Sequence, residues 1–295
     1  MVFPIISGRK KGRCIPVKVN KNMKKLNTRK KRVLNVDELN AYKVAYGKPL
    51  KTKDFVYYVG IPAFLFAGFT FLLLYYWWLS SIMAVLGSFY GMKVLLPKSV
   101  GKDYHIQSFA QRNKFVNNIT QILTDDGKTV TRALEIASTR AKGEFQKDIN
   151  ELLARLIGAD NIIINYAFKS MGNKYQDDVV FAQFLEQLET AMLEGRTNID
   201  TLKDIKTYHN DMKKKQSEYQ NKKNGHLTDM KMLGIVVVIF LLAVSFSFGI
   251  STYINDFARQ PIGWVTCGVY MLLMGQFFHK FSLFLFDDSV LEVSL

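Results

Sequence analysis

Few residues in this 295-residue sequence have the types and spacing that catalysis requires. Gly127-Lys128-Thr129 resembles the end of a phosphate-binding loop, but the first glycine of such a loop would fall at position 122, which is isoleucine. No strand is predicted before this segment. We therefore expect no nucleotide to bind here.

The remaining reactive side chains also lack partners at useful spacing. Asp125-Asp126 and Asp177-Asp178 lie at predicted helix starts, where carboxylates favour the helix dipole, so we interpret them as helix caps. No serine has the Gly-x-Ser-x-Gly context of a nucleophile. The two cysteines cannot form a disulfide framework. The histidines show no metal-ligand spacing: His105, His209, His226 and His279. We expect no enzyme, cofactor or metal site.

The apolar residues are concentrated in long runs. Phe55 to Met92 carries no charged side chain over 38 positions. A single helix needs about 20 apolar residues to cross a bilayer, so this run predicts two spans. We place the turn at Leu79-Ser80-Ser81 and the end of the second helix at Pro97.

Two further uncharged runs follow later in the chain. They extend from Met232 to Asn255 and from Gln260 to Phe278, and the polar segment Asn255 to Pro261 joins them. The sequence thus predicts two transmembrane hairpins, over residues 55–97 and 232–286.

The charge distribution predicts the orientation of these spans. Residues 1–54 hold 16 Lys and Arg against 3 Asp and Glu, whereas the remaining residues hold 24 against 22. Because basic flanks stay on the cytosolic side, we expect a multi-pass protein of the cytoplasmic (inner) membrane with both termini in the cytosol. The C-terminal tail is then 287–295.

The basic tail, residues 1–54, is predicted to be disordered. Its densest cluster, Arg29-Lys30-Lys31-Arg32, suits anionic lipid or the acidic surface of an ATPase. Nucleic acid is a further alternative, but the tail has few aromatic residues for base stacking. Val36 to Tyr46 could form a short amphipathic helix lying on the membrane.

Residues 98–231 show repeated apolar stripes at helical spacing and few strand signals. The predicted fold class is therefore an all-α integral membrane protein, with two hairpins flanking a cytosolic bundle of about six helices. The last of these helices, from Ile199 to Lys231, is predicted to run straight into the third span. Its cluster Lys213-Lys214-Lys215 is interpreted as a solvated face near anionic lipid or as a partner-docking patch.

Two segments resemble a known family. Gly127 to Leu134 is similar to its pattern of a glycine, a small loop and an Ala-Leu pair that opens a helix. Leu193 to Leu202 resembles its glycine turn followed by asparagine and a later leucine, here Gly195, Asn198 and Leu202. Both occur in the F domain of type II secretion and type IV pilus assembly platform proteins, and the order of spans and bundle resembles the TadB/TadC branch.

The resemblance implies a non-enzymatic platform that couples a hexameric secretion ATPase to the insertion of pilin-like subunits. It also implies that Gly127 and Gly195 shape turns and contact no ligand. It also makes a homodimer or homo-oligomer plausible. Two alternatives stay open: a membrane component of a conjugation or DNA-transfer apparatus with a nucleic-acid-binding tail, and a membrane anchor without a motor.

Overall fold

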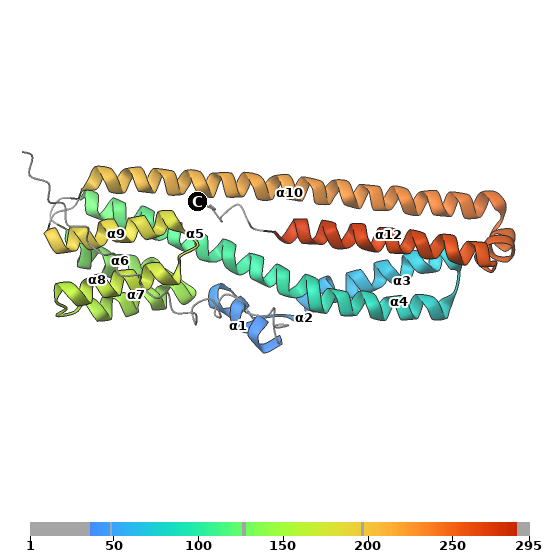
Figure 1. The fold of residues 1–295 in the computed structure, drawn as a ribbon, viewed down its shortest axis with the longest axis horizontal. Coiled ribbons are helices and arrows are strands. Elements are labelled where there is room, and N and C mark those ends of the chain that lie inside the picture. Colours follow the sequence, from blue (N-terminus) through green and yellow to red (C-terminus); the bar gives the residue numbers. More distant parts are fainter. Residues whose placement is uncertain (1–35, 48, 126–127, 196–197, 288–295) are drawn as a thin grey trace, which may run out of the picture. The chain divides into compact units, whose positions relative to one another are not determined.

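The computed structural model describes residues 36–47, 49–125, 128–195 and 198–287, and every element in these ranges is helical (Figure 1). The all-α prediction is therefore confirmed. Four helices are long and apolar enough to cross a membrane: Thr52–Leu74, Trp77–Thr124, Ile199–Phe248 and Pro261–Phe286. We call the apolar parts of these helices the candidate spans.

The first two candidate spans form a tight antiparallel pair. The first comprises α2 (Thr52–Phe55), the π-helical turn η1 (Val56–Gly60) and α3 (Ile61–Leu74). The second begins with α4 (Trp77–Tyr90). A Cβ atom added to Gly87 would lie 2.9 Å from the carbonyl oxygen of Pro62, and one added to Gly91 would collide with the carbonyl oxygen of Tyr58. Gly87 and Gly91 thus form a small-xxx-small contact that brings the two backbones together.

The predicted turn at Leu79-Ser80-Ser81 is wrong. The chain reverses at Tyr75 and Tyr76, where Tyr75 adopts a left-handed conformation with φ of 53°. Ser80 and Ser81 lie within the first five residues of α4. Their hydroxyls donate to the carbonyl oxygens four residues earlier, so these polar groups are satisfied inside the helix.

Pro97 does not end the second helix. Helix α4 continues through the π-helical turn η2 (Gly91–Leu95) into α5 (Leu96–Thr124), so 48 residues form one helix. Proline lacks the N–H group that an α-helix uses and crowds the preceding turn. In both helices the wider π-helical turn ends two residues before the proline, at Pro62 and at Pro97, and so accommodates it.

In the sequence between the two pairs of candidate spans, six helical segments surround one apolar core. They are α5, α6 (Val130–Arg140), α7 (Gly143–Leu156), α8 (Asn161–Lys174), α9 (Val179–Glu194) and the first part of α10 (Ile199–Phe248). Five phenylalanines are buried in this core among a larger number of aliphatic residues: Phe115, Phe145, Phe168, Phe181 and Phe184. Helix α10 is continuous over 50 residues, as the lack of proline predicted.

The N-terminal helix α1 (Val36–Tyr46) packs on this bundle. Leu39 is buried, the Tyr42 and Tyr46 rings contact Tyr104 of α5, and the Tyr46 hydroxyl donates to Ser108. The predicted tail of residues 1–54 was therefore too long. Helix α1 buries Leu39 against protein but leaves Tyr42 and Val44 exposed, so its placement on a membrane surface stays a prediction.

The second pair of spans is joined differently from the prediction. Helix α10 ends at Phe248, Gly249 takes a φ of 81°, and α11 (Ile250–Thr252) and the π-helical turn η3 (Tyr253–Ala258) precede α12 (Pro261–Phe286). Much of the predicted polar loop is thus helical, and α12 continues past the uncharged run to Phe286, the predicted end of the second hairpin. The Tyr253 hydroxyl donates to the Leu73 carbonyl oxygen, which ties this turn to the first pair.

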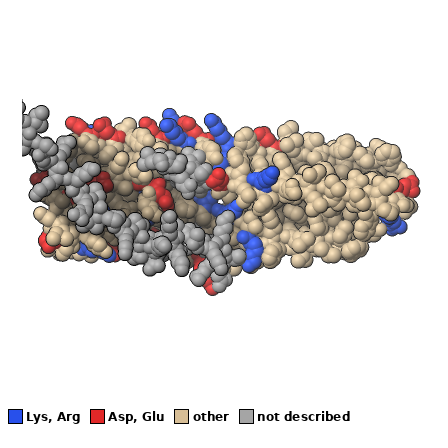
Figure 2. Space-filling view, viewed as in Figure 1, with Lys and Arg blue, Asp and Glu red and all other residues tan. Residues whose placement is uncertain are grey.

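Charged side chains are nearly absent from the surface of the candidate spans (Figure 2). Lysine and arginine gather at the edge of this uncharged surface. Aromatic rings gather around the turns at the opposite end of the spans, where Tyr76 contacts Trp264 and Tyr75 contacts Tyr253. Both distributions are typical of membrane-water boundaries.

We predict that Gly91→Ala destabilises the first helix pair by about 1–3 kcal/mol, because the added methyl group meets the backbone of Tyr58. The measurement is thermal unfolding of the full chain in a mild detergent. Gly68→Ala is the matched control, since a Cβ atom there has nothing within 4 Å. Equal stability of the Gly91 and Gly68 variants would contradict the close-packed pair.

Candidate functional site at the junction of the two long helices

A buried polar network joins α5 to α10. It includes Arg112 and Asn113 of α5, Asp178 before α9, and His209 of α10, each less than 9% exposed. Polar groups in such surroundings are tolerated only when they are hydrogen-bonded. We call this network the polar junction.

Asp178 is the centre of the polar junction. Its Oδ2 atom accepts a hydrogen bond of 2.7 Å from Arg112 Nε and lies 3.3 Å from His209 Nε2. Its other oxygen accepts from the backbone N–H of Phe181 at 3.0 Å and so caps α9. One carboxylate therefore links three helices.

Electrostatics keeps this carboxylate ionised. Burial raises the pKa of Asp178, but the hydrogen bond from His209 and the positive charge of Arg112 outweigh burial and lower the pKa below its ordinary value. The guanidinium also lies over the Tyr175 ring, 4.9 Å from its centre, and donates to Ser108 at 2.7 Å. The charge of Arg112 is thus held in place on several sides.

His209 is fully buried, and both of its ring nitrogens have partners. Its ring stacks on Phe109 with 4.8 Å between centres. The Nδ1 atom lies 3.0 Å from the amide nitrogen of Asn113, and Nε2 faces Asp178. In this geometry Nε2 can donate to Asp178, and Nδ1 can accept from Asn113.

Three asparagines extend the polar junction along the two helices. Asn117 of α5 and Asn210 of α10 exchange two amide hydrogen bonds, of 2.8 and 3.0 Å. Asn113 donates to Asn210 at 2.8 Å and accepts from Lys213 at 3.1 Å. Reciprocal amide pairs of this kind form in only one register, so they fix how α5 and α10 align.

A second polar cluster lies on the α1 side of the bundle. Lys174 at the end of α8 pairs with Glu144 at 2.9 Å and Asp148 at 2.7 Å, and Tyr104 donates to Glu144 at 2.9 Å. Burial raises the pKa of Glu144, but the hydrogen bonds from Lys174 and Tyr104 lower it overall. Tyr175 donates to Asp148 and touches Arg112, which connects this cluster to the polar junction.

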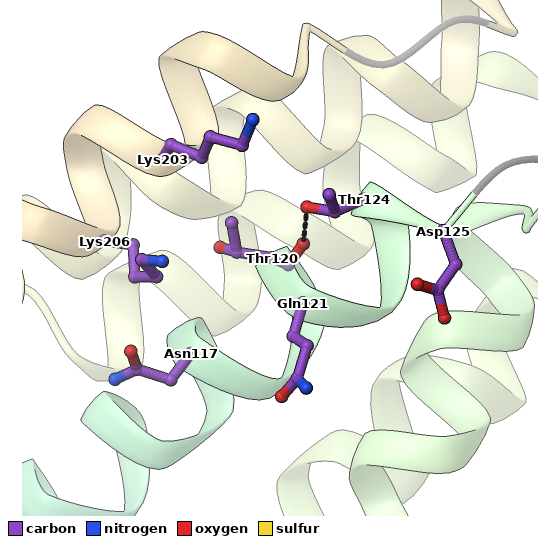
Figure 3. A pocket seen from close by; sticks show the side chains of 7 residues that line it. All are labelled: Asn117, Thr120, Gln121, Thr124, Asp125, Lys203 and Lys206. Atoms are coloured by element: carbon purple, nitrogen blue, oxygen red, sulfur yellow. Dashed lines mark hydrogen bonds between the residues drawn. The ribbon is translucent and has the colours of Figure 1, made fainter.

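An open pocket of about 360 Å³ lies between α5 and α10, beside the polar junction and on its side away from the candidate spans (Figure 3). Lys203 and Lys206 border it from α10, Asn117 borders it from α5, and Asp125 borders it directly after α5. Thr124 donates to the Thr120 carbonyl oxygen within its wall. Two lysines and one carboxylate line this pocket, and Lys128 pairs with that carboxylate at 2.6 Å.

The structure distributes the predicted turn residues over one end of the bundle. Leu134 and Leu202 are buried in the core. Gly195 ends α9 with a φ of 70°, and the Asn198 side chain caps α10 by accepting from Thr201 N–H. Gly127 lies outside the described residues.

The predicted basic residues fall in different places. Lys213 donates to Asn113 in the polar junction, whereas Lys214 and Lys215 are exposed. Lys215 precedes the uncharged run at Met232 by 17 residues, or about 25 Å of helix. That separation does not favour the interpretation of this cluster as a lipid-facing patch. The tail cluster Arg29-Lys30-Lys31-Arg32 lies outside the described residues.

Sequence reasoning missed the polar junction. Asp178 was assigned only as a helix cap, and His209 was dismissed because no other histidine had ligand spacing. A usable signal was present in α5, where Ser108, Arg112 and Asn113 interrupt the apolar stripe that faces the core. Within the described residues no group of three or more His, Cys, Asp or Glu side chains could hold a metal ion.

We predict that Asp178→Asn destabilises the bundle by about 3–5 kcal/mol, because the change leaves Arg112 buried without its charge partner. The measurement is chemical unfolding of the full chain in detergent. Asp177→Asn is the matched control, since this neighbouring carboxylate is exposed.

The same pair of variants tests the electrostatics. A carboxylate whose pKa is lowered by folding stabilises the fold above its unfolded-state pKa, here 3.8, and loses that contribution as the pH falls through the lower folded-state value. The stability difference between wild type and Asp178→Asn should therefore shrink below pH 3.8. A difference that stays constant through this range would contradict the assigned charge state.

The comparisons with known proteins give one relative. No family model and no solved structure matches this chain. It is 56% identical over 266 residues to the uncharacterized protein pXO2-23 of Bacillus anthracis, and the match covers 90% of this chain and 96% of that protein. At this identity and coverage, the chain belongs to the same family as the Bacillus anthracis protein.

Proposed function

We propose that this chain is a non-enzymatic platform of the cytoplasmic membrane in a type II secretion or Tad-like type IV pilus assembly machine. In this proposal the bundle contacts a cytosolic hexameric ATPase, and the spans guide pilin-like subunits from the bilayer into a filament. The proposal also includes assembly of the chain as a homodimer or homo-oligomer in contact with anionic lipid.

The observation that carries the proposal is the continuity of two helices. The helix Trp77–Thr124 and helix α10 each include a candidate span and a side of the bundle without a break. The polar junction joins these two helices to each other. A displacement of the bundle is therefore expected to reach both pairs of spans, because neither helix contains a loop that could absorb it.

Charge supports the proposed orientation. The turns at the far end of the spans hold only Asp256 and Arg259 as charged residues. The ends nearest the bundle hold several lysines: Lys93, Lys98, Lys102, Lys222, Lys223, Lys231 and Lys280. Basic residues favour the cytosolic side, which supports a cytosolic bundle and short external turns.

The DNA-transfer alternative depends on the basic residues before position 36, which lie outside the described part of the chain. The interpretation as an anchor without a motor makes no use of the two continuous helices. We therefore keep both alternatives as outcomes of the experiments below.

We predict that Asp256→Cys reacts with a membrane-impermeant maleimide on intact cells, whereas Asn150→Cys reacts only after the cells are opened. Both positions are exposed, one beside the far turn and one on α7. The background variant carries Cys14→Ser and Cys267→Ser. Labelling of Asn150→Cys on intact cells would overturn the cytosolic bundle.

We predict that Asn224→Pro in α10 abolishes filament assembly or secretion while the chain still co-purifies with its ATPase. Asn224 is exposed and lies between the polar junction and the uncharged run. Proline inside a helix costs about 3 kcal/mol and interrupts its hydrogen bonds. Asn224→Ala is the control and should keep full function.

The measurement is a tagged pull-down in mild detergent together with a filament or secretion assay in the native host. Recovery of a hexameric ATPase and pilin-like subunits supports the proposal. Recovery of nucleic acid with a relaxase would favour the DNA-transfer alternative, and recovery of neither from folded protein would favour the anchor.

A further inference from the structure

A groove of about 300 Å³ lies between α10 and α12 where the uncharged surface begins. Apolar side chains form most of its wall: Met230, Leu233, Phe277, Phe281 and Phe284. His226 and Asp229 of α10 complete it. The groove thus combines a long apolar floor with a small polar region.

The polarity of the groove changes along its length. Helices α10 and α12 run in opposite directions, and the rings of His226 and Phe284 face each other with 6.2 Å between centres. Seven residues further into the uncharged surface, Leu233 and Phe277 line the groove, about 10 Å deeper. Its polar end therefore lies at the boundary and its apolar end lies among the candidate spans.

Cations accompany the polar end from both helices. Lys222 is exposed one turn before His226 on the same side of α10. Lys280 shares the helix stripe of Phe277, Phe281 and Phe284 on α12. Asp229 opposes them with one carboxylate, which is 78% exposed and lies 3.9 Å from His226. The balance of charge around this end is positive.

Two more lysines hold the end of α12 beside this groove. Lys102 of α5 donates to the Leu285 carbonyl oxygen at 3.3 Å, and Lys223 of α10 donates to the Asp287 carbonyl oxygen. The Lys223 ammonium also lies over the rings of Tyr219 and Phe284. These contacts place further positive charge at the same level, and they fix the wall that Phe284 forms.

We propose that this groove binds one anionic phospholipid, with its phosphate near Lys222 and His226 and one acyl chain along Leu233, Phe277 and Phe281. A phospholipid has the same order of charge and apolar length as the groove. His226 precedes the uncharged run at Met232 by six residues, or about 9 Å of helix, which is the level of lipid headgroups. The inference rests on the membrane insertion that the proposed function assumes.

A lipid in this position contacts α10 and α12 together. The sequence predicted anionic lipid near the tail cluster Arg29 to Arg32 and offered it as one interpretation of Lys213-Lys214-Lys215. The groove lies nearer to the uncharged run than Lys213-Lys214-Lys215 does. Bound lipid is expected to stabilise the last turns of α12 against α10, because it packs on Phe277 and Phe284, which the protein itself leaves exposed.

The test is native mass spectrometry of the full chain in detergent, titrated with phosphatidylglycerol or with phosphatidylcholine of the same acyl chains. The wild type should retain one phosphatidylglycerol at concentrations where phosphatidylcholine is lost. Lys222→Gln/His226→Gln should lower the occupancy by phosphatidylglycerol at least fivefold. Lys214→Gln/Lys215→Gln is the matched control, since it removes two charges from exposed positions of the same helix.

Three outcomes would overturn the inference. The site variant could bind phosphatidylglycerol as well as the control variant, both lipids could bind the wild type equally, or millimolar glycerol phosphate could displace the lipid, which would indicate a site for small anions. Phe277→Ala/Phe281→Ala should weaken retention without changing the headgroup preference, and unchanged retention would also overturn the acyl-chain placement. Thermal unfolding confirms that each variant is folded.

Failure of the platform proposal gives a different result. A pull-down without an ATPase would leave specific phosphatidylglycerol binding intact, whereas loss of lipid specificity would leave recovery of the ATPase intact.

Discussion

The ion pair between Arg112 and Asp178 is the interaction on which the arrangement of the two long helices depends. Its charges are buried, so each requires the other, and His209 completes the site from α10. An apolar contact between α5 and α10 could slide by a turn at little cost, but the carboxylate and the paired amides of Asn117 and Asn210 have partners in only one alignment. The positions of both helix pairs relative to the bundle follow from that alignment.

The sequence was sufficient to predict an all-helical chain with four long apolar helices, because long uncharged runs and apolar stripes of helical period are strong signals. The ends of the helices inside the apolar runs were harder to predict. A helix that is apolar on all sides has no stripe to mark its ends, so Ser80, Ser81 and Pro97 became the evidence for boundaries. Each of them is accommodated within a helix, by a back-bonded hydroxyl or by a π-helical turn.

The polar junction was harder to predict than the fold. Arg112 and Asp178 are 66 positions apart, and Asn113 and His209 are 96 apart, so only the folded bundle brings them together. Residue type was also ambiguous, because a carboxylate before a helix looks the same whether it only caps or also pairs. Asp178 does both. Lys213 shows the same ambiguity, since a lysine within a charged run gave no sign of its contact with Asn113.

The π-helical turn at Gly91–Leu95 has a geometric consequence for the whole helix Trp77–Thr124. Each residue of an α-helix advances the rotation about the axis by about 100°, so a turn that contains one extra residue rotates everything after it by that amount. The side of α4 that contacts α3 and the side of α5 that packs into the core therefore do not have to face the same direction. A single-residue deletion in this turn would keep the helix continuous and yet twist the bundle about a quarter of a revolution relative to the first helix pair. The length of this five-residue segment, more than its composition, therefore determines the rotation of the bundle relative to the first helix pair.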